Sequence, residues 1–159
     1  MTAIKQLIEH VSVQNIEERK RNVEALEQLM LNSDKRIELN RLRHFWSGDV
    51  YCRELFMPAG AVVVGRIHKF DHMEIMLSGK VTLSTNDGSV EELSGYNVFE
   101  AQAGKKRVLY MHEDTIWLTF HSAPNADPDY LLDYLSCETY EQFIEFQEQL
   151  KALEQESRV

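Results

Sequence analysis

The sequence lacks the features that mark several specialised classes of protein. None of its apolar runs approaches the roughly 18 residues that a membrane-spanning helix needs, so we expect no membrane association. Its first residues do not combine a basic start, an apolar stretch and a small-residue cleavage site, so we expect no secretion signal and a cytoplasmic location. The two cysteines, Cys52 and Cys137, have no C-x-x-C spacing, which favours reduced thiols over a disulfide.

Acidic residues outnumber basic ones, and the sequence has no complete motif of a nucleotide-binding loop or of a serine hydrolase. There are 17 Lys and Arg against 26 Asp and Glu, and the net charge of −9 repels a phosphate backbone, which argues against nucleic-acid binding. No G-x-S-x-G nucleophile motif occurs. Gly60 and Gly65 have the spacing of a phosphate-binding loop, but Arg66 and Ile67 stand where Lys and Ser or Thr are needed.

Glycine and proline divide the chain into three regions. Residues 1–45 contain neither, and apolar residues recur there at helical spacing, which predicts an N-terminal extension of one or two helices with a break near Asn32-Ser33-Asp34. Residues 46–123 hold all seven glycines, and short β-prone runs between them predict an antiparallel barrel or sandwich. Residues 124–159 return to helix, with an N-cap and proline at Asp127-Pro128 and a capping box from Thr139 to Gln142.

Eight strands are expected in the middle region. They are Val50–Phe56, Ala61–His68, Glu74–Leu77, Lys80–Thr85, Val90–Leu93, Asn97–Ala101, Arg107–Met111 and Thr115–His121. Turns are expected at Pro58-Ala59-Gly60 and at Asn86-Asp87-Gly88, because glycine supplies the positive φ that tight turns need.

The middle region resembles the cupin superfamily, whose first motif runs between two glycines and carries two histidines and a glutamate. In the stretch from Gly60 to Gly79, His72 falls at the position of the family's glutamate. His68 falls at the second histidine, and Arg66 at the first. The second motif is matched by Gly95 and Gly104, with Gln102 and Arg107 near its proline and histidine. The resemblance implies a mainly β, cupin-type antiparallel barrel or jelly roll with helical extensions at both ends.

More closely, the chain resembles short cupin-like proteins that are encoded by tailed bacteriophages. The shared features are the turn Pro58-Ala59-Gly60, the pair His68 and His72, the turn Gly104-Lys105-Lys106-Arg107, and the pair Trp117 and His121. The basic turn by itself is typical of a solvated surface loop. This resemblance implies a protein that acts in a host cytoplasm.

Strand periodicity shows which of these side chains can meet. Alternate residues of a strand share a face, so we expect Arg66 and His68 to point the same way as Val62 and Val64.

On two other strands, His72 shares a face with Glu74, and His121 shares a face with Trp117. If the barrel interior receives these faces, His68, His72 and His121 converge. Three imidazoles suit a divalent metal ion such as Zn, Fe, Mn or Ni, with a position left open for water or substrate. The alternative is that scattered histidines have no common role.

Other polar residues are candidates for ligand binding and catalysis. Glu74 and Tyr110 are acid–base candidates, and Arg66 and Arg107 could clamp an anionic ligand. The arginines could equally pair with Glu54, Glu74 or Glu100.

Three functions are consistent with these patterns. The first is a metal-dependent cupin that binds or processes a small anionic molecule. The second is a non-catalytic module that binds a small ligand or a host protein, and the loss of three family ligands favours it. The third is self-assembly as a homodimer or larger homo-oligomer, for which the apolar helices at both ends offer a surface. Whether the protein is an enzyme stays open at this stage.

Overall fold

The computed structural model describes residues 2–85 and 87–157, so Asn86 of the expected hairpin turn lies outside the described residues. The helices are α1 (Thr2–Val11), α2 (Ile16–Leu31), α3 (Pro128–Leu135) and α4 (Tyr140–Glu156). The first six strands are β1 (Leu42–Ser47), β2 (Val50–Met57), β3 (Val62–Val64), β4 (Ile67–His68), β5 (His72–Ser78) and β6 (Lys80–Ser84). The remaining strands are β7 (Val90–Ser94), β8 (Asn97–Ala101), β9 (Val108–Met111), β10 (Thr115–Ser122) and β11 (Ser136–Cys137).

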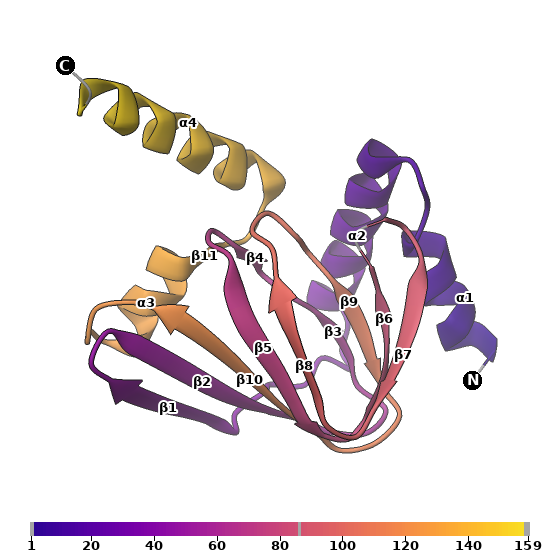
Figure 1. Cartoon of the computed structure of the whole chain (residues 1–159). Coiled ribbons are helices and arrows are strands. Elements are labelled where there is room, and N and C mark those ends of the chain that lie inside the picture. Colours follow the sequence, from indigo (N-terminus) through magenta and orange to yellow (C-terminus); the bar gives the residue numbers. More distant parts are fainter. Residues whose placement is uncertain (1, 86, 158–159) are drawn as a thin grey trace.

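Two antiparallel sheets enclose the core (Figure 1). One has the strand order β1-β2-β10-β5-β8 and the other the order β3-β9-β6-β7. Without the edge strand β1, each sheet has four strands, and the chain passes between the sheets as it does in a double-stranded β-helix. The expected antiparallel jelly roll is therefore confirmed by the strand order, and the expected helices lie at both ends of the chain.

The ends of the barrel differ from the sequence expectation in two places. Strand β1 begins at Leu42, inside the region expected to be helical, and pairs along its whole length with β2. Strand β11 lies between the two C-terminal helices and pairs with β4. Strand β1 is added at the edge of a barrel sheet, whereas β11 and β4 form a separate two-stranded sheet. Each depends on a partner strand, so local sequence pattern alone does not reveal it.

The expected strand Ala61–His68 is broken in the middle. Strand β3 ends at Val64, and β4 resumes at Ile67 with a different partner. Because Gly65 and Arg66 interrupt the alternation, Val62 and Val64 pack outward toward the N-terminal helices while His68 lines the interior. The prediction that Arg66 and His68 share a face with the two valines is therefore wrong.

Three apolar clusters hold the barrel and its helices together, and one of them packs Leu131 and Leu135 of α3 against Tyr51 of β2. The interior cluster between the sheets is built around Met76, Met111 and Trp117. Helices α1 and α2 cover the outer face of the four-stranded sheet, where Ile8 and Val23 are almost fully buried (Figure 1).

Helices α3 and α4 begin at the capping residues that the sequence predicts. Asp127 caps α3, whose first position is Pro128, and Thr139 caps α4 through a complete capping box with Gln142. Helix α4 projects away from the barrel, and it has no buried residue in the part of the chain that the structure describes (Figure 1).

Among the described helices, none combines the length and the apolar composition that crossing a membrane requires.

Candidate metal centre

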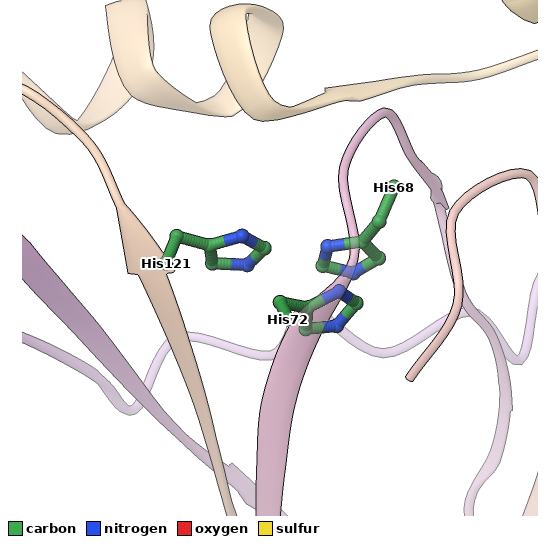
Figure 2. A group of neighbouring side chains, drawn as sticks. All are labelled: His68, His72 and His121. Carbon is green, nitrogen blue, oxygen red and sulfur yellow. The ribbon is translucent and has the colours of Figure 1, made fainter. Parts of the chain in front are cut away.

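Three segments that are distant in the sequence bring His68, His72 and His121 together (Figure 2). His68 ends the short strand β4, which is held by pairing with Ser136 of β11. His72 opens β5, and His121 lies near the end of β10. These two strands pair with Phe120 opposite Met73, so the inward positions on either side of that pair are neighbours.

The geometry of the three rings is compatible with a metal site after a small closure. The ring centroids of His68 and His72 are 4.0 Å apart, those of His72 and His121 are 4.4 Å apart, and those of His68 and His121 are 5.1 Å apart. One nitrogen from each ring lies within 4.8 Å of the others. Nitrogens at 2.0–2.1 Å from a tetrahedral ion are about 3.4 Å apart, so the nitrogens would have to close by at most roughly 1.4 Å. The rings are stacked, with interplanar angles of 3°, 19° and 20°, so they would also have to turn toward the ion.

Two nitrogens of the three rings are buried and have no hydrogen-bond partner among the described residues. The Nδ1 atoms of His68 and His121 are both buried and unpartnered. A buried polar atom without a partner costs stability, and such an atom is explained when it faces a ligand. The donor set and these two orphaned atoms therefore fit a metal ion.

The third imidazole is already engaged. His72 Nδ1 lies 3.1 Å from the Phe70 carbonyl oxygen, and Nε2 lies 2.9 Å from Glu74 Oε1. A neutral imidazole donates from one nitrogen only, so a metal ion on the other nitrogen would replace one of these contacts. If Nε2–H keeps its bond, the Glu74 carboxylate supports the ring as carboxylates support other ligating histidines.

The surroundings keep two of the rings neutral. Burial lowers the pKa of His68 well below 6.5, and the neighbouring His72 and His121 act in the same direction. Burial, followed by the charges of His72 and Arg53, lowers the pKa of His121 to about 3. Neutral imidazole is the form that ligates a metal, so neither ring has to lose a proton first at neutral pH.

A cavity of about 100 Å³ adjoins the histidines inside the barrel and receives most of the predicted site residues. Glu74, Arg66, Arg107, His68 and His72 all line it. His121 does not line this cavity; it lines a second one, described below.

The two predicted anion-binding arginines both have carboxylate partners. Arg107 donates to Glu74 Oε2 at 2.9 Å, which is one of the pairings expected from the sequence. Arg66 donates instead to Glu138 at 2.9 Å and to Asp133 at 3.3 Å, both near the C-terminal helices rather than in the barrel.

Tyr110 is not brought to the site. It packs with the cluster that joins the outer face of the sheet to the N-terminal helices, and its ring lies edge-on to His112 with centroids 4.8 Å apart. It does not line the cavity, whereas its neighbour Leu109 does. Strand β9 therefore presents Tyr110 on the face away from Glu74.

The expected solvated turn at Lys105–Arg107 is buried in its middle residue. The Lys106 ammonium donates to Glu27 Oε2 at 2.5 Å and to the Glu138 carbonyl oxygen at 2.6 Å, and its side chain has no exposed surface. The solvated-loop expectation is wrong for this residue because α2 and the segment before α4 cover the turn.

Sequence reasoning missed Arg53. It lies on the inner face of β2, directly opposite Thr119 on β10 and His44 on β1. It lines the barrel cavity and has no hydrogen bond or ion pair to any residue in the described part of the chain. Arg53 is two residues from the buried Tyr51 on the same strand, and this alternation indicates that its side chain points inward. Only the strand register places the guanidinium beside the histidines.

The comparisons with known proteins concern the fold. A scan against protein-family models finds no match, and a search of curated proteins finds none either. Among solved structures, a cupin-superfamily protein of Desulfitobacterium hafniense is 15% identical, with a TM-score of 0.42, covering 55% of this chain and 83% of that one. A cupin-2 domain protein of Shewanella frigidimarina is 11% identical, with a TM-score of 0.43, covering 62% and 91%. A double-stranded β-helix protein of Klebsiella pneumoniae is 15% identical, with a TM-score of 0.45, covering 58% and 85%. Similarity at this level says nothing about the ligand or the chemistry of this chain.

Proposed function

We propose that this protein binds a divalent metal ion (Zn, Fe, Mn or Ni) through His68, His72 and His121 and holds a small anionic ligand beside it. The observation that carries the proposal is the convergence of three buried or half-buried imidazoles, two of which have an unpartnered Nδ1. Such an ion, when bound, would activate water or dioxygen or polarise a carbonyl group of the ligand.

The charges around the barrel cavity support an anionic ligand. Of the described residues that line it, four are cationic, namely Arg53, Arg66, Lys105 and Arg107, and only Glu74 is acidic. This positive lining lies in a protein whose net charge is −9. A cavity of one sign with apolar walls concentrates ligands of the opposite sign, so the cavity favours anions over neutral molecules.

Glu74 has a positioning role in this proposal. One of its oxygens accepts from His72 and the other from Arg107, so the carboxylate fixes the orientation of both side chains. It remains our candidate for acid–base work, which requires one of these contacts to be exchanged for the ligand. We assign no role to Tyr110, because its strand faces it away from the cavity.

Metal analysis of protein purified without a histidine tag tests the proposal. We expect close to one equivalent of metal in the wild type and a large loss in each of His68→Ala, His72→Ala and His121→Ala. His112→Ala is the matched control, because His112 bonds to Thr82 away from the cluster. Saturating metal should also raise the free energy of unfolding by about 2.7 kcal/mol at 100 times the dissociation constant. Equal metal in the wild type and all three cluster variants would place the site elsewhere.

A second candidate is a binding module without catalysis. It is favoured by the engagement of both Glu74 oxygens, because Glu74 is the sole carboxylate among the described residues of the cavity. In the phage setting that the motif resemblance implies, such a module would sequester a ligand or block a protein in the host cytoplasm. Mass spectrometry of co-purified small molecules, and a pull-down from host lysate, distinguish these two kinds of partner.

Self-assembly is supported by the apolar surface of α4. Ile144 and Leu153 on this helix are 50% and 63% exposed, although apolar residues recur along it at helical spacing. A homodimer or larger homo-oligomer would cover them. Light scattering of the wild type beside Ile144→Glu tests this, and a monomer in both samples would contradict it.

A further inference from the structure

Arg53 differs from the other cations of the barrel cavity because it has no partner. Arg66 and Arg107 each pair with a carboxylate, and Lys105 donates to Gln102 Oε1 at 2.6 Å. Arg53 makes no hydrogen bond or ion pair to any described residue, although it is half-buried on the inner face of its sheet.

A half-buried guanidinium without a partner is a poor arrangement unless a ligand completes it. Removing charge from water is costly when nothing in the protein compensates for it. The planar guanidinium offers paired N–H donors whose spacing matches the two oxygens of a carboxylate. Strand register fixes the Arg53 backbone between His44 and Thr119, so its direction into the barrel is set by the fold.

A second cavity, of about 150 Å³, opens on the other side of Arg53 beneath helix α3. His68 and His121 line it as well, so this cavity adjoins the candidate metal centre directly. Its aliphatic lining consists of Leu42, Pro128, Leu131, Leu132 and Leu135. Polar side chains, including Thr119, Asp129 and Ser136, line the rest of it. A cavity of similar volume holds a molecule of the size of benzene.

These observations specify the chemistry of the ligand. We propose that Arg53 binds the carboxylate of a small monocarboxylic acid whose apolar body occupies the cavity beneath α3, next to His68 and His121. A doubly charged phosphate fits less well, because Arg53 is the one cationic side chain among the described residues that line this cavity and Asp129 lines it too, so a second negative charge would have no counter-ion. The inference rests on the proposed metal centre only for the position of the ligand, since Arg53 and the leucines do not depend on the ion.

Calorimetric titration with benzoate and its neutral isostere benzamide tests the role of the charge. We expect benzoate to bind the wild type at least 10-fold more tightly than benzamide, in both zinc-loaded and metal-free protein. Arg53→Met should weaken benzoate binding at least 10-fold, and Arg53→Lys should retain part of it. Arg43→Met is the matched control, because Arg43 pairs with Glu54 on the outer face of the same sheet. No benzoate binding to the wild type, or equal binding to Arg53→Met, would overturn the inference.

A filling substitution tests the location of the apolar body. Leu132→Trp should weaken benzoate binding at least 10-fold while leaving acetate binding unchanged, because acetate needs only Arg53. Circular dichroism and metal content of this variant check that the fold is intact. Equal loss of acetate and benzoate would place the ligand body elsewhere, and displacement of benzoate by inorganic phosphate at lower concentration than by acetate would reject the carboxylate class.

The outcomes separate this inference from the proposed function. Arg53-dependent benzoate binding in a protein that takes up no metal would overturn the metal centre and leave the carboxylate site standing. Normal metal uptake together with benzoate binding that does not depend on Arg53 would overturn the carboxylate site and leave the metal centre standing.

Discussion

The buried histidines make the stability of the metal-free protein depend on pH in a direction that the structure specifies. Burial lowers the pKa of His121 to about 3, whereas an unfolded histidine titrates near 6.5. Below pH 6.5 the unfolded chain therefore binds a proton that the folded protein does not. The free energy of unfolding falls as the pH drops, and it continues to fall until the pH nears 3.

The size of the effect follows from the two pKa values. At pH 5 the pH lies about 1.5 units below the pKa of the unfolded imidazole. The free energy of unfolding is then lower than at pH 7.5 by about 2 kcal/mol. His121 is only 5% exposed, so solvent screening does little to reduce this figure. His68 adds to the loss in the same direction, because its pKa is also well below 6.5.

Urea unfolding at pH 7.5 and pH 5, in the presence of EDTA, measures this dependence. Both proteins should lose free energy of unfolding between pH 7.5 and pH 5. We expect the loss in His121→Asn to be smaller than the loss in the wild type by about 2 kcal/mol. His10→Asn, which removes an exposed histidine of α1, should fall in parallel with the wild type. Parallel curves for His121→Asn and the wild type would refute the reasoning, because they would mean that His121 is protonated equally in both states.

Two further predictions concern the framework that supports the site. Gly79→Ala should lower the free energy of unfolding by about 3 kcal/mol, because φ is +112° and an added Cβ would lie 2.8 Å from the Thr115 Cα. Gly95→Ala should lower it by only about 1–2 kcal/mol, because nothing lies within 4 Å of its Cβ position. Chemical denaturation measures both, and equal losses would show that the close approach to Thr115 is unimportant. Lys106→Met should cost about 1–3 kcal/mol, since it leaves the Glu27 carboxylate and a carbonyl oxygen without their donor, and a change below about 0.5 kcal/mol would show that the ion pair contributes nothing.

Much of the fold follows from local signals in the sequence. Glycines at turns and alternation within short runs predict seven of the eight expected strands to within two residues at each end, because a strand with one buried face needs apolar side chains at every second position. The eighth, Ala61–His68, is divided into β3 and β4. The ends of α3 and α4 follow from Asp127 and Thr139, whose side chains satisfy backbone N–H groups that each helix leaves free. The inward directions of His72 and His121 follow from the same alternation.

The tertiary structure decided the rest, because those features depend on which strands and helices become neighbours. Tyr110 and Leu109 both fit the pattern of β9, and only the position of α1 and α2 determines which face is the outside of the barrel. Lys106 looks like a surface lysine until α2 brings Glu27 to it. Arg53 looks like one charge among many along its strand, and only the pairing of β2 with β10 places it, without a partner, beside the three histidines. Sequence fixes the period of each element, but non-local packing selects the face that becomes a site.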